Sequence, residues 1–162
     1  MKPRFEELSP KKLVGRRVRM SFAKDATARL WKGFMPARKN IKDVSGRELF
    51  SVQVYPPSFF ERMDPHEEFE KWATAEVSDF ADVPEDMETL ILEGGLYAVF
   101  LYHGASSKAD SFFKYIFTEW LPESGYELDS RPHFEILGEK YKNDDPNSEE
   151  EIWIPIKSRI RR

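Results

Sequence analysis

The amino-acid sequence predicts an α+β fold: a duplicated strand-helix-strand-strand module with antiparallel sheets, a pseudo-twofold axis and a central ligand cleft. Two observations predict it. The pattern of strand, helix, strand, strand occurs twice along the 162 residues. The two runs also keep a nearly constant spacing, 83 residues from Leu13 to Leu96 and 81 from Trp72 to Trp153. The predicted domain is residues 1–162, with repeat halves at about 13–80 and 96–157.

The elements of the first half follow from the spacing of apolar residues. Apolar and polar residues alternate from Phe50 to Val54, which is typical of a half-buried strand. Apolar residues at helical spacing from Leu30 to Met35 predict a helix that Pro36 ends or kinks. The predicted segments are a strand at 13–22, a helix at 25–41, strands at 48–57 and 67–78, and a turn with a short edge segment at 82–95.

The second half repeats this order. Phe113, Phe117 and Leu121 lie at i, i+4 and i+8, which predicts an amphipathic helix over 107–121 that ends at Pro122. An acidic loop separates the last two strands. The predicted strands of this half are 96–104, 131–139 and 149–157.

Composition excludes several classes of chemistry. The chain has no cysteine, which removes disulfides, thiolate metal sites and cysteine nucleophiles. Its three histidines lie in separate segments without metal-ligand spacing, so we expect neither a metal nor another cofactor. No apolar run approaches the ~18 residues of a spanning helix, and the N-terminus lacks the apolar core of a signal peptide. We therefore expect a cytoplasmic protein without a membrane partner.

Charge is distributed unevenly along the chain. The net charge is −4, yet residues 1–42 hold thirteen Lys and Arg against three Asp and Glu. Such a segment can contact an anionic partner or face the acidic elements of its own domain. We favour internal pairing and expect no direct nucleic-acid binding, because the segment lacks interleaved base-stacking aromatics and any helix-turn-helix or basic-region pattern.

The sequence also predicts which side chains line the cleft. Helices cover the more apolar face of a sheet, which assigns Phe50 and Val52 in the first half, and Phe134 and Ile136 in the second, to the helix side. The opposite, open faces then carry Ser51, Gln53, Tyr55, Trp72, His133, Glu135 and Trp153.

Glu135 is the most informative of these residues. Glutamate is poorly suited to the middle of a strand and is rarely buried without a partner. A carboxylate among aromatic rings attracts flat, lipophilic cations, and desolvation raises its pKa toward values useful in proton transfer. Three alternatives remain: Trp72 and Trp153 as ordinary core aromatics, Glu135 in a structural ion pair, and His133 as a satisfied strand residue.

Four stretches together resemble a known family. They are "LVGRRVRMSF", "LYAVFLYHG", "EWLPESGYELDSRPHFEIL" and "EEEIWIPIK". In order and spacing they are similar to the GyrI-like small-molecule-binding domain, which is the effector-binding domain of AraC-class and MerR-class multidrug regulators. The resemblance runs from about Leu13 to Lys157. We expect a stand-alone form, since a DNA-binding domain does not fit beside it in this length.

The resemblance implies a cleft that binds bulky aromatic or cationic compounds. The family's glutamate, in its "P-x-F-E" strand, matches Glu135, and the aromatic of its last strand matches Trp153. Tyr55 and Trp72 match by position on their strands. The full predicted ligand-binding set is Tyr55, Trp72, Trp120, His133, Glu135 and Trp153.

Three functions follow from the resemblance. The leading one is a drug-binding or drug-sequestering module with a glutamate anchor. The second is a hydrolase that opens the strained ring of cyclopropane-bearing DNA-alkylating toxins, with Glu135 as its catalytic carboxylate. The third is a DNA gyrase modulator that uses the basic segment 1–42 as its contact surface.

Overall fold

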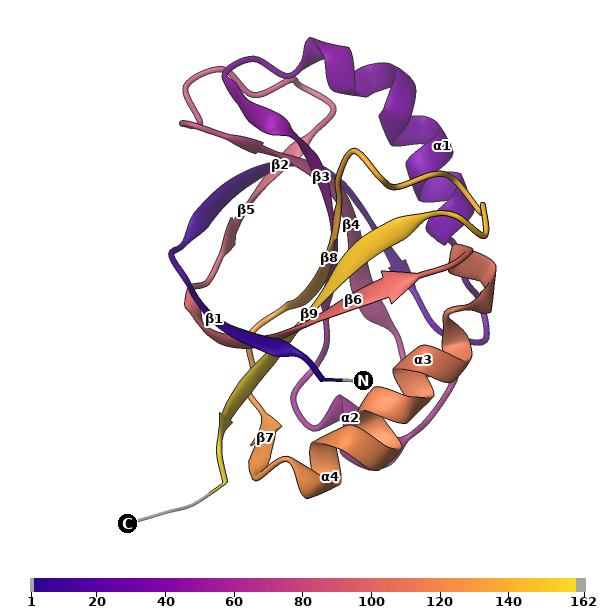
Figure 1. Ribbon diagram of the computed structural model, residues 1–162. Coiled ribbons are helices and arrows are strands. Elements are labelled where there is room, and N and C mark those ends of the chain that lie inside the picture. The colour runs from indigo at the N-terminus through magenta and orange to yellow at the C-terminus, as the bar shows by residue number, and fades with distance from the viewer. Residues whose placement is uncertain (1, 160–162) are drawn as a thin grey trace.

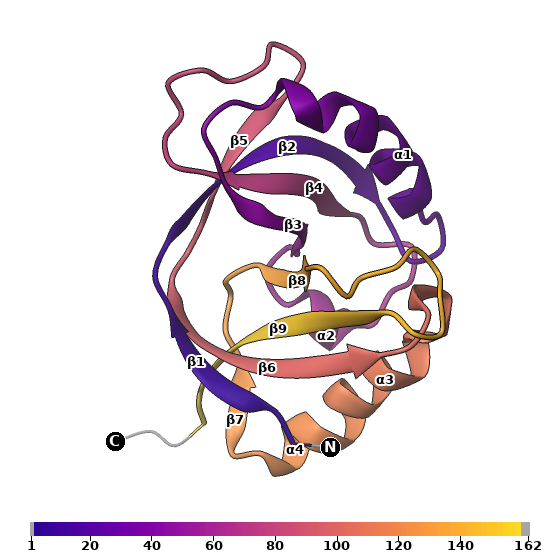
Figure 2. The same ribbon diagram turned by 45° about the horizontal axis from the view of Figure 1, so that its top comes forward.

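The computed structural model describes residues 2–159, which form one curled antiparallel sheet with short helices beside it (Figure 1). All strand pairings among the described residues are antiparallel, and the sheet bends into a half-barrel that is visible from two directions (Figures 1 and 2). The strands are β1 (Arg4–Leu8), β2 (Lys11–Met20), β3 (Val44–Val54), β4 (Phe69–Val77), β5 (Glu88–Leu92), β6 (Gly95–His103), β7 (Tyr126–Leu128), β8 (His133–Leu137) and β9 (Glu149–Ser158).

Helices follow the first strand of each half. In the first half α1 (Thr27–Ala37) continues into a 3-10 turn, η1 (Arg38–Asn40). Pro36 lies in the last turn of α1. In the second half a single helical run passes through a π-helical turn, η3, before it ends. The short helix α2 (Phe59–Arg62) lies between β3 and β4. The remaining segments are η2 (Ser106–Lys108), α3 (Asp110–Tyr115), η3 (Ile116–Trp120) and α4 (Leu121–Glu123).

Strands β3 and β8 join the two halves of the sheet. The strand order is β1-β6-β9-β8-β3-β4-β2-β5, and β7 pairs with β9 beside this path. Outward from the β3–β8 seam, one half therefore runs β3, β4, β2 and the other runs β8, β9, β6. In the seam Ser51 pairs with Glu135, and Gln53 pairs with His133. Because paired residues share a face of the sheet, this register decides which side chains meet.

The curl gives the sheet two buried faces. The inner face, which carries no helix, is filled by one cluster from both halves: Leu13, Phe50, Val52, Trp72, Leu92, Tyr97, Val99, Phe134, Ile136 and Trp153. The helix-covered face holds three further clusters. One packs Ala73 and Ala75 against Leu30 and Phe34 of α1, and another packs the β6 and β9 side chains against the α3–α4 run. The third packs Phe59 of α2 against Met20 and Phe69.

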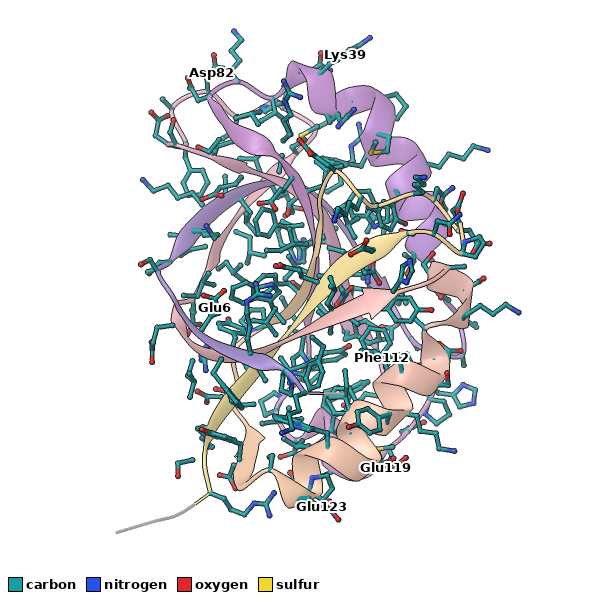
Figure 3. The ribbon with its side chains drawn as sticks, viewed as in Figure 1. Glu6, Lys39, Asp82, Phe112, Glu119 and Glu123 are labelled. Carbon is teal, nitrogen blue, oxygen red and sulfur yellow. The ribbon has the colours of Figure 1, made fainter. Side chains whose placement is uncertain are left out.

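The outer cluster of the second half can be followed in Figure 3. Phe112 of α3 lies between helix and sheet, and its ring meets Phe100 edge-on with centroids 6.0 Å apart. Glu119 and Glu123 lie on the exposed outer side of the same helical run. This division between faces is what the apolar spacing of the sequence predicts for an amphipathic helix.

Most predicted elements are confirmed, with three omissions and one error of orientation. Strands β1 and β7 and helix α2 were not predicted, and the second helix continues past Pro122 to Glu123. The assignment of Phe50, Val52, Phe134 and Ile136 to the helix side is wrong, because they belong to the inner cluster. The physical reason is the curl: the inner face is closed on itself and buries apolar side chains without needing a helix.

Candidate functional site

The β3–β8 seam brings four polar side chains together on the helix-covered face. Ser51 and Gln53 of β3 lie opposite Glu135 and His133 of β8, as the strand alternation predicted for this group. The Gln53 amide nitrogen donates a hydrogen bond to the Glu135 carboxylate at 3.0 Å. All four side chains are buried. The seam therefore holds a carboxylate in a polar cradle below the helices.

Lys71 is the cationic partner of this carboxylate. It lies on β4 opposite Gln53, and its Nζ is 3.8 Å from Oε1 of Glu135. The two side chains are only 11% and 10% exposed. Burial raises the pKa of the Glu135 carboxyl above its ordinary value, whereas the Lys71 charge and the Gln53 hydrogen bond oppose that rise. Sequence reasoning had left open a structural ion pair for Glu135, and this contact is one.

A second carboxylate belongs to the same cluster. Glu150 lies near the start of β9, paired across the sheet with Tyr102, and is 9% exposed. Burial raises its pKa to about 7, and the negative charge of Glu135 adds to the rise while Lys71 opposes it. The sequence analysis missed Glu150 because it reads as the end of the acidic loop. The sequence feature that could have identified Glu150 is the alternation of the last strand, which places Glu150 and Ile152 on the same face.

A group of aromatic rings lies beside the polar side chains, around His133. The ring of Tyr55, just beyond β3, meets the His133 imidazole edge-on with centroids 4.9 Å apart. Phe60 of α2 stacks on His133 at 5.3 Å and on Phe117 of η3 at 4.9 Å. Four rings from four segments, namely Tyr55, Phe60, Phe117 and His133, thus meet beside the polar cradle.

Burial keeps two of these rings uncharged. Desolvation lowers the pKa of His133 to about 3, so the imidazole is neutral at physiological pH. Burial and the Glu135 charge raise the pKa of the Tyr55 phenol, which holds it protonated. Neutral rings suit an aromatic ligand that stacks among them, and a cation gains further from their π-faces.

Helix α2 covers this group of rings. It is four residues long and follows two prolines, Pro56 and Pro57. The residues that flank it, Ser58 and Met63, have φ angles of 61° and 50°. Side chains other than glycine pay roughly 1 kcal/mol or more in this left-handed conformation. The cover is therefore short and strained, held mainly by Phe59 and Phe60 in the aromatic group.

Two of the predicted site residues, Trp72 and Trp153, lie on the inner face and not with Glu135. Trp153 stacks on Phe134 with centroids 5.1 Å apart. Each indole nitrogen donates to a glutamate two residues earlier, Trp72 to Glu70 at 3.1 Å and Trp153 to Glu151 at 3.0 Å. Both tryptophans belong to the inner cluster, which is the core alternative that the sequence analysis had left open.

Trp120, the remaining predicted residue, lies on the helix-covered face but near the β1 edge. Its ring meets Phe100 edge-on at 5.1 Å and Phe5 of β1 at 6.3 Å. The structure thus brings Tyr55, His133 and Glu135 together and places Trp120 among the packing residues of the α3–α4 run.

Six of the thirteen basic residues of segment 1–42 form ion pairs with acidic side chains of the same domain. Arg17 bridges Glu70 and Glu88 at 2.8 and 3.0 Å, and Arg19 contacts Glu68 at 3.3 Å. The other ion pairs of this segment are Arg4 with Glu6 and Glu151, Lys11 with Glu76, Arg16 with Asp86 and Lys42 with Asp82. These pairs support the expectation that the excess positive charge faces acidic elements of the same domain.

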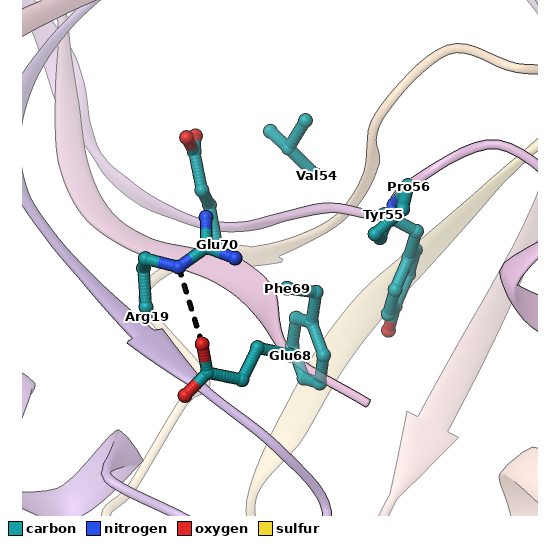
Figure 4. A pocket seen from close by; sticks show the side chains of 7 residues that line it. All are labelled: Arg19, Val54, Tyr55, Pro56, Glu68, Phe69 and Glu70. Carbon is teal, nitrogen blue, oxygen red and sulfur yellow. Dashed lines mark hydrogen bonds and ion pairs between the residues drawn. The ribbon is translucent and has the colours of Figure 1, made fainter. Parts of the chain in front are cut away.

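Two surface pockets lie at the open end of β2–β4 near this site. The smaller, of about 170 Å³, is lined by Val54 and Tyr55 on one side and by the Arg19–Glu68 pair on the other (Figure 4). The larger, of about 420 Å³, lies beside it toward the start of α1. Glu135 lines neither pocket, and its side chain is buried.

Two further features bear on function. Within residues 2–159 no group of three or more His, Asp or Glu side chains is arranged to hold a metal ion. In the same part of the chain, no helix has the length and apolarity needed to cross a membrane.

A buried carboxylate beside aromatic rings combines the apolar walls and the few polar groups that are typical of small-molecule sites. The model of the GyrI-like small molecule binding domain matches residues 1–157, and the chain belongs to that family. This confirms the resemblance seen in the sequence.

Known relatives share the fold. The chain is 28% identical over 157 residues to the transcriptional regulator BrlR of Pseudomonas aeruginosa. The matched region is 96% of this chain but only 56% of BrlR, so the chain spans about half the length of that relative. The structure of SAV2435 bound to tetraphenylphosphonium is similar with a TM-score of 0.70 and 18% identity, covering 97% of this chain and 94% of that one. A hydrolase from Listeria innocua gives a TM-score of 0.61 and 12% identity, covering 96% and 92%.

Proposed function

We propose that this domain binds hydrophobic aromatic small molecules, cationic ones among them, on the helix-covered face at the β3–β8 seam. The observation that carries the proposal is the buried Glu135 carboxylate, two residues from His133 on the same face of β8, where His133 meets the rings of Tyr55 and Phe60. Rings supply stacking surface and the carboxylate supplies countercharge, which together suit a flat lipophilic cation. The tetraphenylphosphonium bound by SAV2435 is a ligand of this chemical class and supports the proposal.

Ligand binding at Glu135 requires α2 to move. Drug-sized sites enclose about 300–1,000 Å³, whereas the pocket that Tyr55 lines is about 170 Å³ and does not reach Glu135. Phe60 occupies the space between His133 and Phe117 where a ligand ring would stack. A four-residue helix flanked by left-handed Ser58 and Met63 is the least costly element to displace. Displacement of Phe60 by a ligand ring would exchange one stacked aromatic for another.

The two halves of the sheet are, in this proposal, a duplicated module with the ligand at its pseudo-twofold seam. The order β2-α1-β3-β4 corresponds to β6-α3-β8-β9, and the sheet order is mirrored about the β3–β8 pair. The carboxylate and its cradle come from the two seam strands. Such a seam offers a ligand contacts from both halves at once.

Titration with tetraphenylphosphonium tests the proposal. Isothermal calorimetry on the full chain should show saturable binding that Glu135→Gln weakens, and Glu76→Gln should leave it unchanged. Glu76 is a matched control because it has the same charge and pairs with Lys11 away from the seam. Absence of binding by this and other aromatic cations would refute the proposed ligand class.

A hydrolase that opens strained, cyclopropane-bearing rings is the second candidate. The observation in its favour is Glu150, whose pKa of about 7 beside a second carboxylate suits a general base at physiological pH. In this candidate Glu135 remains the expected catalytic carboxylate, and ring strain in the substrate supplies much of the driving force. Product mass after incubation with a cyclopropane-bearing alkylator separates turnover from binding. Gyrase modulation and a cytoplasmic location stay expectations.

A further inference from the structure

Lys71 is a buried cation at the place where a cationic ligand would find its countercharge. Its Nζ lies 3.8 Å from Oε1 of Glu135, and the Lys71 residue as a whole is 9% exposed. The cross-strand row Lys71, Gln53, His133 places all three side chains on the helix-covered face. A buried lysine is uncommon unless it is paired, and here the pair is Glu135.

The cluster already contains a cation that neutralises one of its carboxylates. The charged groups that face one another are Glu135 of β8, Glu150 of β9 and Lys71 of β4, while His133 is neutral because burial lowers its pKa. Lys71 neutralises one of the two carboxylates. A ligand that brings one positive charge to Glu135 therefore competes with a resident charge of the same sign.

We propose that Lys71 is a specificity-determining residue, an internal cation that a positively charged aromatic ligand has to displace from Glu135. This inference rests on the proposed function, because it concerns the charge of the ligand that the same site takes. Lys71 sets how strongly the site favours cations over neutral or anionic molecules of equal shape. With Lys71 paired to Glu135, stacking and apolar burial contribute most of the binding free energy.

The Lys71 ammonium is able to leave Glu135 without a change in the sheet. The lysine stem is long and flexible, and 3.8 Å is a loose contact for an ammonium and a carboxylate. When a ligand cation occupies Glu135, the Lys71 side chain turns away from that carboxylate on its flexible stem.

Two probes of nearly equal shape and opposite charge test this inference. Tetraphenylphosphonium and tetraphenylborate are titrated by calorimetry into wild-type protein and into Lys71→Met, which keeps the side-chain length and removes the charge. We expect the variant to bind the phosphonium more tightly by roughly tenfold to a hundredfold, the scale of one charged contact in a desolvated site. Binding of the borate should weaken, because Glu135 and Glu150 then lack their cation.

Lys11→Met is the matched control. It removes the same charge and also breaks an ion pair, with Glu76 at 3.4 Å, on another part of the sheet. Lys11→Met should leave the affinities for tetraphenylphosphonium and for tetraphenylborate unchanged. Loss of one partner from a buried ion pair is costly, so Lys71→Gln replaces Lys71→Met if circular dichroism shows that the methionine variant is unfolded.

The outcomes distinguish two claims: that the wild-type protein binds aromatic cations, and that Lys71 determines its preference for charge. Phosphonium binding that appears only in the Lys71 variant supports the role of Lys71 and overturns cation binding by the wild type. Wild-type phosphonium binding that the folded variant leaves unchanged or weakens overturns the role of Lys71 alone. Tighter binding of both probes would assign the gain to added space and would also overturn it. Failure of both proteins to bind either probe overturns both claims.

Discussion

Phe60 of α2 stacks on the imidazole of His133, with ring centroids 5.3 Å apart and planes 25° from parallel. Phe60 also stacks on the ring of Phe117, with centroids 4.9 Å apart. A single side chain on a four-residue helix thus packs against Tyr55 of the first half of the chain and His133 of the second. In the proposed function, the ring of an aromatic ligand takes the place of this side chain.

Phe60→Ala should open the site. Removal of the ring deletes the stacked contacts with His133 and Phe117, so access to Glu135 no longer requires displacement of a side chain. We expect faster association of tetraphenylphosphonium in stopped-flow fluorescence and a tighter equilibrium affinity. The free energy of unfolding should fall by less than the roughly 3–5 kcal/mol of a fully buried phenylalanine. Phe22→Ala, another aromatic truncation near α2, is the control; slower association by Phe60→Ala would count against α2 as a cover.

Glu135→Gln should keep the fold and weaken binding of aromatic cations by about 1–3 kcal/mol, the scale of a charge-assisted contact. Gln53 can still hydrogen-bond the amide that replaces the carboxylate, which preserves the cradle. Calorimetry with tetraphenylphosphonium measures the change. Equal affinity in a folded variant would remove Glu135 as the anchor.

Glu150 should make stability depend on pH. Its pKa is about 7 in the folded protein against an ordinary value of 4.5, so the folded state holds a proton that the unfolded state releases. Stability therefore falls as pH rises from about 4.5 to about 7. Glu150→Gln should be more stable than wild type above pH 7 by on the order of 3 kcal/mol and equal to it near pH 4.

Urea unfolding at several pH values checks this prediction. Glu149→Gln is the matched control, because Glu149 is the adjacent glutamate and its side chain is 27% exposed beside Lys140. It should keep the wild-type pH dependence. Parallel curves for wild type and Glu150→Gln across pH 4–8 would contradict the assignment.

Trp153→Phe should affect stability and not binding. The indole stacks on Phe134 and donates to Glu151 on the inner face, so the substitution should cost roughly 1–3 kcal/mol of unfolding free energy. The affinity for tetraphenylphosphonium should be unchanged, because the inner face lies across the sheet from Glu135. Trp72→Phe should behave alike. Weaker binding without a loss of stability would return the tryptophans to the ligand site.

The basic segment should not bind DNA tightly. Arg16, Arg17 and Arg19 of β2 each pair with an acidic side chain of the same domain. Non-specific DNA binding depends on counterion release and is strongest at low salt. Fluorescence anisotropy with a labelled duplex at low salt should therefore show little binding by this chain. Tight binding that salt abolishes would make residues 1–42 a nucleic-acid surface.

The sequence allowed much of the fold to be predicted but only part of the site. Apolar periodicity predicted the helices and main strands, and the alternation of β3 and β8 correctly grouped Tyr55 and Gln53 with His133 and Glu135. The prediction that this group lies on the open face is wrong, because Glu135 shares its face with Ile152, which packs against the α3–α4 run. The rule that helices take the more apolar face fails when a curled sheet buries its inner face as well.

The cover was missed for a different reason. Helix α2 is too short to show periodicity, and its signal was only a pair of phenylalanines after two prolines. Lys71 was missed because the prediction for β4 concerned the face that carries Trp72, and Lys71 lies on the other face of that strand. Contacts that depend on three or four distant segments, such as Lys71 with Glu135 or Phe60 with His133, require the register of the folded sheet.

An NMR titration of the full chain with tetraphenylphosphonium tests the central claim most directly, since amide and indole N–H signals report on both faces of the sheet at once. If the ligand site lies on the helix-covered face, ring-current shifts should concentrate in α2, at Tyr55 and at His133–Glu135. The indole signals of Trp72 and Trp153 should stay nearly unmoved. Shifts confined to those two indoles and the strands around them, with α2 unaffected, would contradict the account.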